Sequence, residues 1–144
     1  MNHKVMNVLE FDKILNLLAE HASSDAGKSK CLSLLPSCNI EEINFTQHQT
    51  EDALNRLFKK GSVSFSGTRN INAALKRLEM GSILSIEELL DIAVLLETTN
   101  RVKTYSRKET PDVPDDSLTA LFDELEPLTP VSSEIRRCIL SEDE

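Results

Sequence analysis

The fold is decided by the stretch Gly81-Ser-Ile-Leu-Ser-Ile-Glu-Glu-Leu-Leu-Asp-Ile-Ala-Val-Leu-Leu-Glu-Thr-Thr99. Ser85 is placed to accept a hydrogen bond from the Glu88 amide, while the Glu88 carboxylate accepts one from the Ser85 amide, and this pair forms the capping box of a helix start. Apolar residues then recur at the helical intervals of three and four, and they are Leu89, Ile92, Ala93 and Leu96, widened by Ile86, Leu90 and Val94. The stretch predicts a long helix, continuing to about residue 106, buried on two sides and without reactive groups on its buried side.

Similar amphipathic segments occupy most of the remaining chain. Gly61 and Gly81 are placed to end two of them, and Pro36, Pro127 and Pro130 interrupt the pattern. The expected helices cover about 10–22, 25–34, 40–60, 71–80, 86–106, 117–125 and 134–140. The connector 62–68 has apolar residues in alternation and predicts a short extended stretch, but two strands are needed for a sheet. The sequence therefore predicts an all-α fold, a multi-helix bundle of about seven helices.

Three regions follow from this pattern. Residues 1–106 form the main helical core, 107–116 form a flexible acidic linker that contains two prolines and four acidic residues, and 117–144 contain short helices. Nine apolar side chains are expected to pack the helices against each other. They are Phe11, Ile14, Leu18, Leu54, Leu57, Leu75, Leu89, Ile92 and Leu96.

Composition narrows the class of protein. The chain has 144 residues, of which 40% are apolar, and this suits one domain that buries roughly 70% of its unfolded surface. Aromatic residues make up 4% and Trp is absent, so there are few platforms on which single-stranded nucleic acid could stack. Neither a signal peptide nor a membrane span is evident, and Cys31, Cys38 and Cys138 are too irregular for a disulfide framework. We therefore expect free thiols and a cytoplasmic protein with no membrane partner.

Charge is divided unevenly along the chain. Residues 1–80 carry 10 Lys or Arg and 9 Asp or Glu, a net charge of +1, whereas 81–144 carry 6 and 15, a net charge of −9. No basic face of the kind that binds a phosphate backbone is evident. The nearest basic candidates are Arg56, Lys59, Lys60, Arg69, Lys76 and Arg77. Their spacing is explained equally well by the solvated sides of two amphipathic helices, and we favour that interpretation.

Apparent chemical motifs have simpler explanations. Residues 22–29 end like a phosphate-binding loop, but Ala22 replaces the leading glycine and no strand precedes it. The smallness of Gly27 is better explained by a close approach of two helices. His3, His21, His48 and the cysteines lack the paired spacing of a zinc site, and no Ser or Cys nucleophile has a base nearby in sequence. We therefore predict no catalytic, cofactor-binding or metal-binding residue.

Along most of the chain, the order and spacing of certain residues resemble those found in one protein family. The residues concerned are Leu9-Glu10-Phe11, Lys13-Ile14, Leu18, Ala22-Ser23, Gly27-Lys28, Leu35-Pro36, Thr50-Glu51, Ala53-Leu54, Gly61-Ser62, Leu75-Lys76-Arg77, Gly81, Leu84-Ser85 and Glu88-Leu89-Leu90-Asp91-Ile92. Over residues 8–139 the chain resembles the N-terminal region of MutS-two, the second bacterial MutS paralogue. Two positions depart from the expected pattern, with Asn70 in place of Asp and Leu78 in place of a small Ala, which would add volume to a helix interface.

The resemblance implies a function that lies mostly outside these residues. Members of the family resemble MutS without its mismatch-reading domain, with a helical core and clamp, a dimerising ATPase domain that uses ATP and Mg²⁺, and a C-terminal nuclease domain. The family is linked to suppression of homologous recombination and to the splitting of collided ribosomes. No catalytic motif of the family matches a position here. Residues 117–144 would then begin the continuation into the rest of such a protein.

Two main hypotheses from different classes remain, beside a weaker third, direct nucleic-acid binding by the near-neutral first half, which salt-dependent binding to duplex DNA or ribosomes would test. The first is a non-catalytic helical scaffold, part of the core and lever of such a protein, that relays motion between the ATPase and the clamp. DNA or the ribosome would be reached through the full-length protein, homodimers would form through its other domains, and the chain alone would be a monomer. The second is an independent helical protein-interaction module.

Overall fold

The computed structural model describes residues 6, 8–107 and 114–139, and these residues contain seven helices and no strand. The helices are α2 (Phe11–Glu20), α3 (Asp25–Leu32), α4 (Ile40–Lys60), α5 (Asn72–Glu79), α6 (Ile86–Ser106), α7 (Thr119–Asp123) and α8 (Thr129–Cys138). The prediction of an all-α fold is confirmed. The long helices α4 and α6 have the bounds that the apolar pattern predicts.

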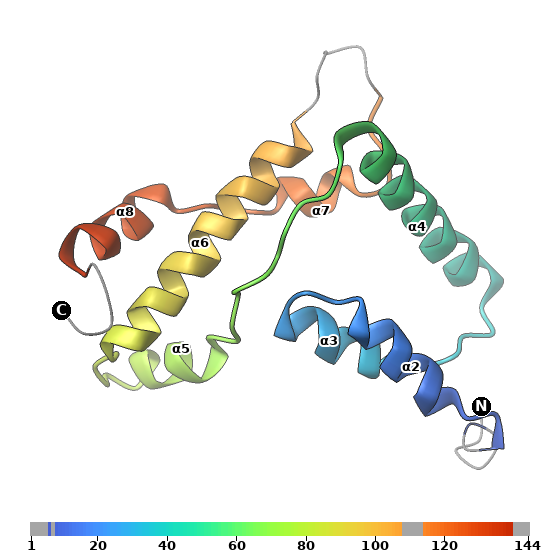
Figure 1. Ribbon diagram of the computed structural model, residues 1–144, viewed down its shortest axis with the longest axis horizontal. Coiled ribbons are helices and arrows are strands. Elements are labelled where there is room, and N and C mark those ends of the chain that lie inside the picture. The colour runs from blue at the N-terminus through green and yellow to red at the C-terminus, as the bar shows by residue number, and fades with distance from the viewer. Residues whose placement is uncertain (1–5, 7, 108–113, 140–144) are drawn as a thin grey trace.

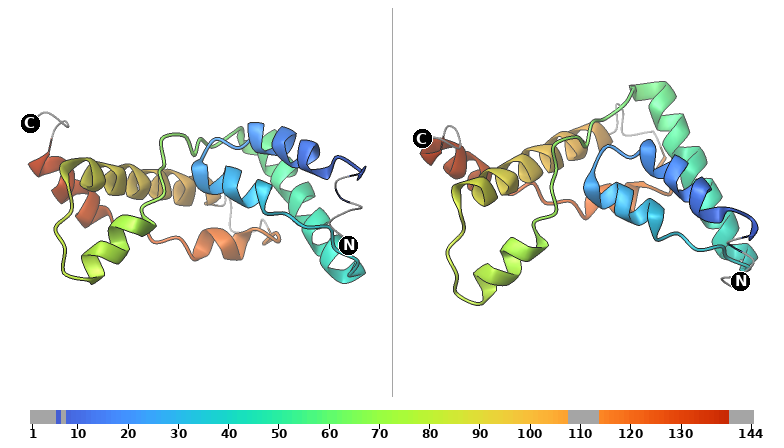
Figure 2. Two further views of the ribbon diagram at one scale, coloured as in Figure 1. Left: turned by 90° about the horizontal axis from the view of Figure 1, so that it is seen from below. Right: turned by 60° about the horizontal axis from the view of Figure 1, so that its bottom comes forward.

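These two long helices form an inverted V (Figure 1). Each has 21 residues and is therefore about 30 Å long. Their C-terminal ends meet at one point, which we call the apex, and their N-terminal ends lie far apart (Figure 1). An antiparallel pair, α2 packed on α3, lies on the α4 side of the V, and α8 packs along α6 on the other side (Figures 1 and 2). The short helix α7 contacts α6 near the apex.

Local capping chemistry explains where several helices begin and end. The capping box of Ser85 and Glu88 is present at the start of α6, as the sequence predicts. The side chain of Asn39 accepts hydrogen bonds from two amides of the first turn of α4, and Ser24 accepts one at the start of α3. Gly81 follows α5 with a φ of 83°, a conformation that favours glycine.

One local prediction is wrong. Helix α8 begins at Thr129, five residues before the expected start, because Pro130 lies in its first turn, where a helix needs no N–H donor. A Cβ at Gly27 would lie 3.0 Å from the Ser24 hydroxyl oxygen and 3.4 Å from the Ala22 Cβ, which follows α2. The small residue therefore suits both the cap of its own helix and the close passage of the segment that follows α2.

Few apolar residues are fully buried within the described residues. The buried apolar residues are Ala19, Ala74, Ala93 and Val102, none of them large. Of the nine side chains expected to pack together, five are exposed (Ile14, Leu18, Leu54, Leu57 and Leu75) and four are half-buried (Phe11, Leu89, Ile92 and Leu96). Leu78, expected to crowd a helix interface, is exposed as well. These packing predictions are wrong for the exposed residues, because the apolar sides of α2, α4 and α5 that carry them are left uncovered by the described residues.

The total surface agrees with this picture. The chain exposes 10811 Å², whereas a compact monomer of 16.1 kDa exposes about 7,400 Å². The prediction that the chain buries its stripes within one core is therefore wrong.

The two connectors differ in what the structure describes. Residues 61–71 run as a non-helical, extended connection between α4 and α5, without a strand partner in the described part of the chain (Figure 2). In the predicted linker, 108–113 lie outside the described residues, and 114–116 lead into α7 without forming a helix. None of the helices described here has the length and apolar character needed to cross a membrane.

Candidate functional site

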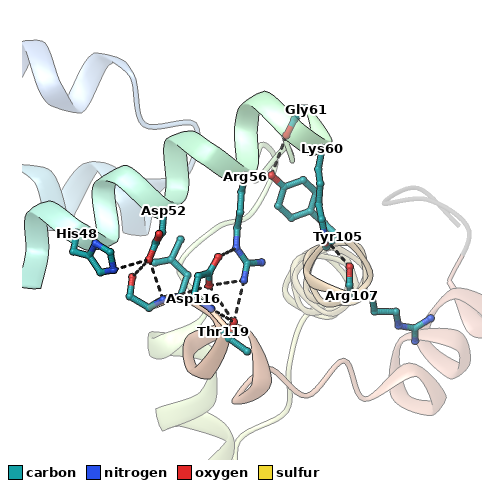
Figure 3. Close-up of polar contacts among 11 residues, drawn as sticks. His48, Asp52, Arg56, Lys60, Gly61, Tyr105, Arg107, Asp116 and Thr119 are labelled. Carbon is teal, nitrogen blue, oxygen red and sulfur yellow. Dashed lines mark hydrogen bonds and ion pairs between the residues drawn. The ribbon is translucent and has the colours of Figure 1, made fainter. Parts of the chain in front are cut away.

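A polar stripe on α4 faces the apex. His48, Asp52, Arg56 and Lys60 follow each other at intervals of four residues, so they share one side of the helix. Figure 3 shows this stripe directed at the segment that leads into α7 and at the end of α6. The apolar residues of α4, among them Leu54, Leu57 and Phe58, lie on the other side and are exposed. Helix α4 therefore uses its polar side for contacts within the chain.

The central contact joins Arg56 to Asp116. Arg56 Nε donates to Asp116 Oδ2 at 2.6 Å and Arg56 Nη2 donates to Oδ1 at 2.7 Å, a bidentate pair between residues 60 positions apart. The Arg56 side chain is only 13% exposed and that of Asp116 26% exposed. Arg56 also donates to the Thr119 hydroxyl at 3.2 Å. The hydrogen bonds from Arg56 lower the pKa of Asp116 to about 2, so the pair is fully ionised near neutral pH.

A second contact joins Asp52 to Ser117. The Ser117 hydroxyl and amide both donate to Asp52 Oδ2, at 2.6 and 3.0 Å, and they lower the pKa of Asp52. The His48 imidazole lies 3.6 Å from the same oxygen. The carboxylate thus lies between hydroxyl and imidazole, whereas a serine nucleophile needs the imidazole beside its hydroxyl. These three residues position a backbone segment and do not form a catalytic triad.

At the apex the two long helices cap each other's C-terminal ends. Lys60 Nζ donates to the carbonyl oxygens of Tyr105 and Arg107, at 3.3 and 2.5 Å, and the Tyr105 hydroxyl donates to the Gly61 carbonyl at 3.0 Å (Figure 3). The last carbonyls of a helix lack partners within it and carry the negative end of its dipole. A lysine and a tyrosine hydroxyl therefore satisfy groups that would otherwise repel each other where two such ends meet.

Aromatic rings and a groove complete the apex. The Arg56 guanidinium carbon lies 4.6 Å from the centre of the Phe122 ring, and the rings of Phe122 and Tyr105 are 6.4 Å apart. A groove of about 940 Å³ runs between α4, the end of α6 and α7. Five Lys or Arg and four Asp side chains line it. The charges nearly balance, so the groove lacks the strongly positive character of a phosphate site.

The basic candidates from the sequence are mostly engaged. The prediction that these residues lie on the solvated sides of helices is wrong for Arg56 and Lys60, because both make the apex contacts described above. Arg69 pairs with Glu87 at 2.7 Å, and Arg77 pairs with Glu88. In the described part of the chain Lys59 and Lys76 are exposed and no ion pair is formed by either. The structure therefore places these six residues on different surfaces and does not unite them as one basic patch.

The remaining candidates stay separate. His21 directly follows α2, His48 lies on α4, and His3 lies outside the described residues. Within the described ranges no group of three or more His, Cys, Asp or Glu side chains is placed to hold a metal ion. Asn70, at the departure from the family pattern, accepts a hydrogen bond from the Asn72 amide at 2.9 Å and so supports the start of α5 without a charge.

Sequence reasoning missed Asp52, Tyr105, Asp116 and Thr119. Their partners lie 44 to 65 residues away, and a single sequence carries no signal for such pairs. One signal was available. The polar stripe on α4 includes an arginine and an aspartate four residues apart, beside an apolar stripe, and this indicates a helix with two contact faces.

Comparison with known proteins identifies proteins that are similar in sequence to this chain. No protein-family model matches the chain. The chain is 47% identical over 144 residues to a protein of Agathobacter rectalis named endonuclease MutS2, and 45% identical over 149 residues to one of Lachnoclostridium phytofermentans with the same name. A third, from Lachnospira eligens, is 39% identical. Each match covers all of the chain but only 18 to 19% of the relative. The chain thus spans about one fifth of the length of these relatives.

Proposed function

We propose that this chain is a non-catalytic helical scaffold. The premise is that it is homologous to part of the MutS2 proteins, and its resemblance implies that this part is their N-terminal region. In a protein of that family the scaffold connects the parts that bind and hydrolyse ATP with the parts that embrace nucleic acid. Its role is to transmit their relative movement. The observation that carries the proposal is the large apolar surface that the helices leave uncovered.

The amount of uncovered surface favours a permanent partner. Large apolar side chains that are exposed include Val8, Leu9, Leu17, Leu35, Ile40, Phe45, Phe58, Met80 and Ile83. Monomeric soluble proteins rarely expose extended apolar patches, and obligate interfaces are the more apolar class of interface. The other four fifths of a MutS2 polypeptide would supply such a partner without a separate binding event.

Charge and chemistry support a role other than catalysis. The net charge is −8, and the groove at the apex combines both signs of charge. At the apex the Asp52 carboxylate lies between the Ser117 hydroxyl and the His48 imidazole. Nucleophilic catalysis by the serine would need the imidazole next to the hydroxyl. We therefore assign ATP and Mg²⁺ to the ATPase domain of the full-length protein, nucleolytic activity to its nuclease domain, and no cofactor to this chain.

The experiment is an activity assay on the purified chain. We expect a helical circular dichroism spectrum, no ATP hydrolysis and no cleavage of DNA, with a full-length MutS2 protein as positive control. Reproducible turnover by a clean preparation would refute the scaffold proposal.

Contact with the rest of the protein is tested separately. The remaining four fifths of a MutS2 protein is supplied as a second polypeptide, and association with the chain is measured. Phe58→Ser should weaken association because Phe58 lies on the exposed apolar side of α4. Lys59→Ser, at the next position but on the polar side, is the matched control. Equal effects of both substitutions would contradict the assignment of the apolar face.

The family resemblance is also the basis for a proposal about the biological role of the full-length protein. We propose that the full-length protein is a cytoplasmic homodimer that acts on nucleic acid, either suppressing homologous recombination on DNA or rescuing collided ribosomes. Salt-dependent binding of the full-length protein to duplex DNA or to ribosomes distinguishes the two targets.

The alternative is an independent helical interaction module, favoured by the same exposed apolar faces. The reading frame downstream of Glu144 distinguishes the two. Continuation into a glycine-rich phosphate-binding loop supports the scaffold, and a natural stop codon supports the module.

A further inference from the structure

Helix α4 is attached to the rest of the chain differently from α2, α3, α6, α7 and α8. Helix α2 packs on α3, and α6 packs on α7 and α8, whereas α4 has no comparably extensive packing against another helix in the described part of the chain. What joins α4 to the α6 side of the V is polar. The contacts are the Arg56–Asp116 pair, the Asp52–Ser117 hydrogen bonds, and the mutual capping by Lys60 and Tyr105.

All of these contacts lie in the C-terminal half of α4, with Asp52 just past the middle of the helix. Arg56, Lys60 and Gly61 are in or just after its last two turns, and the first turns of α4 lie at the far end of the V (Figures 1 and 3). The connector that follows is extended and non-helical. A helix held by polar groups over its C-terminal half only can turn about that half when those groups rearrange. A rotation of about 10° moves the other end of a 30 Å helix by about 5 Å.

We propose that the apex is a hinge whose angle is set by the pair formed by Arg56 and Asp116. The mutual capping by Lys60 and Tyr105 acts as the pivot, and the bidentate pair holds α4 against the segment that leads into α7. Release of the pair lets α4 swing relative to α6. The functional role of this movement rests on the proposed scaffold function, because a scaffold that relays motion needs a defined hinge.

The chain's own cysteines allow a direct test. Cys38 lies two residues before α4 and Cys138 is the last residue of α8, which packs on α6, and both are exposed. Cys31→Ser leaves these two as sites for spin labels, one on each arm of the V. Double electron–electron resonance then measures the distance between the arms in the 144-residue chain.

We expect one narrow distance distribution for the parent chain. Arg56→Met, which removes the charge and keeps the length, should broaden it and shift its mean by about 5 Å or more, as a turn of about 10° requires. Asp116→Asn, which keeps the shape of the side chain, should broaden it in the same direction. Arg69→Met is the matched control, because Arg69 pairs with Glu87 near the start of α6, far from the apex, and it should leave the distribution unchanged.

Circular dichroism of the same samples completes the test. A hinge contact is not needed to form the helices, so helical content should be retained in both apex variants. Parent-like distances in Arg56→Met and Asp116→Asn, or a loss of helical signal in both, would overturn the hinge. The catalytic assay on the unlabelled chain is independent of this result, so failure of the hinge and failure of the scaffold proposal are distinguishable.

Discussion

Asp116 is the residue whose environment differs most from its expected one. Sequence composition placed it in a flexible acidic linker, but its carboxylate accepts two hydrogen bonds from Arg56 and one from the Leu118 amide. A carboxylate held by so many donors favours its charged form. The end of the linker is therefore fixed to α4, and Asp116 contributes to stability through its charge.

This charge predicts a pH dependence. The pKa of Asp116 falls from 3.8 to about 2 on folding, so the stabilisation is complete above about pH 4 and is lost as the pH falls towards 2. The contribution of the Asp116 charge to the free energy of unfolding is at most about 2 kcal/mol, because the side chain is one-quarter exposed and solvent weakens the interaction. We expect urea unfolding at pH 7 to show Asp116→Asn less stable than the parent. The gap should narrow as the pH is lowered from 4 to 2. A gap of constant size across that range would contradict the assignment.

Whether a contact between two residues can be predicted from the sequence depends on how far apart the two residues are along the chain. The capping box of Ser85 and Glu88 was predictable because both partners lie within four residues and a helix start leaves defined donors unsatisfied. The pairing of Arg56 with Asp116 was not, because many carboxylates are equally acceptable partners for one arginine until the fold brings them together.

At the scale of elements, the apolar period located α4 and α6 with their bounds, located α2, α3, α5 and α7 to within two residues at each end, and misplaced the start of α8. Both long helices have the predicted bounds because their patterns run through five to six turns between clear caps. Helix α8 was misplaced because a proline has two meanings, ending a helix when it lies inside and starting one when it lies in the first turn. The outward direction of the α4 apolar stripe was also unpredictable, since a pattern shows which residues share a face and not what covers it.

Helix α6 is the element whose packing can be tested by substitution. Ala93 is fully buried on α6, which packs against α7 and α8. Ala93→Leu adds volume to a filled site and should lower the free energy of unfolding by about 1 to 3 kcal/mol. Ala73→Leu, on the exposed side of α5, should change it by less than about 0.5 kcal/mol. Urea unfolding followed by circular dichroism measures both, and an equally tolerated Ala93→Leu would show that the site is open.

At the scale of the whole molecule, two opposing forces decide whether the chain associates with itself. Exposed apolar side chains favour association, whereas a net charge of −8 on 144 residues opposes it. The charge lies mainly in the second half of the chain, where α6, α7 and α8 are found, so repulsion is strongest between copies of that arm.

We therefore predict a monomer at micromolar concentration in sedimentation experiments at low ionic strength. Raising the salt shortens the range of the repulsion, to about 10 Å at 0.1 M and about 3 Å at 1 M, without weakening apolar contacts. Any association should then increase with salt. An excess of the remaining MutS2 polypeptide should suppress it, because the same apolar faces would be covered. A stable dimer at low salt that the remaining polypeptide does not disrupt would contradict both the monomer and the assignment of those faces to the rest of the protein.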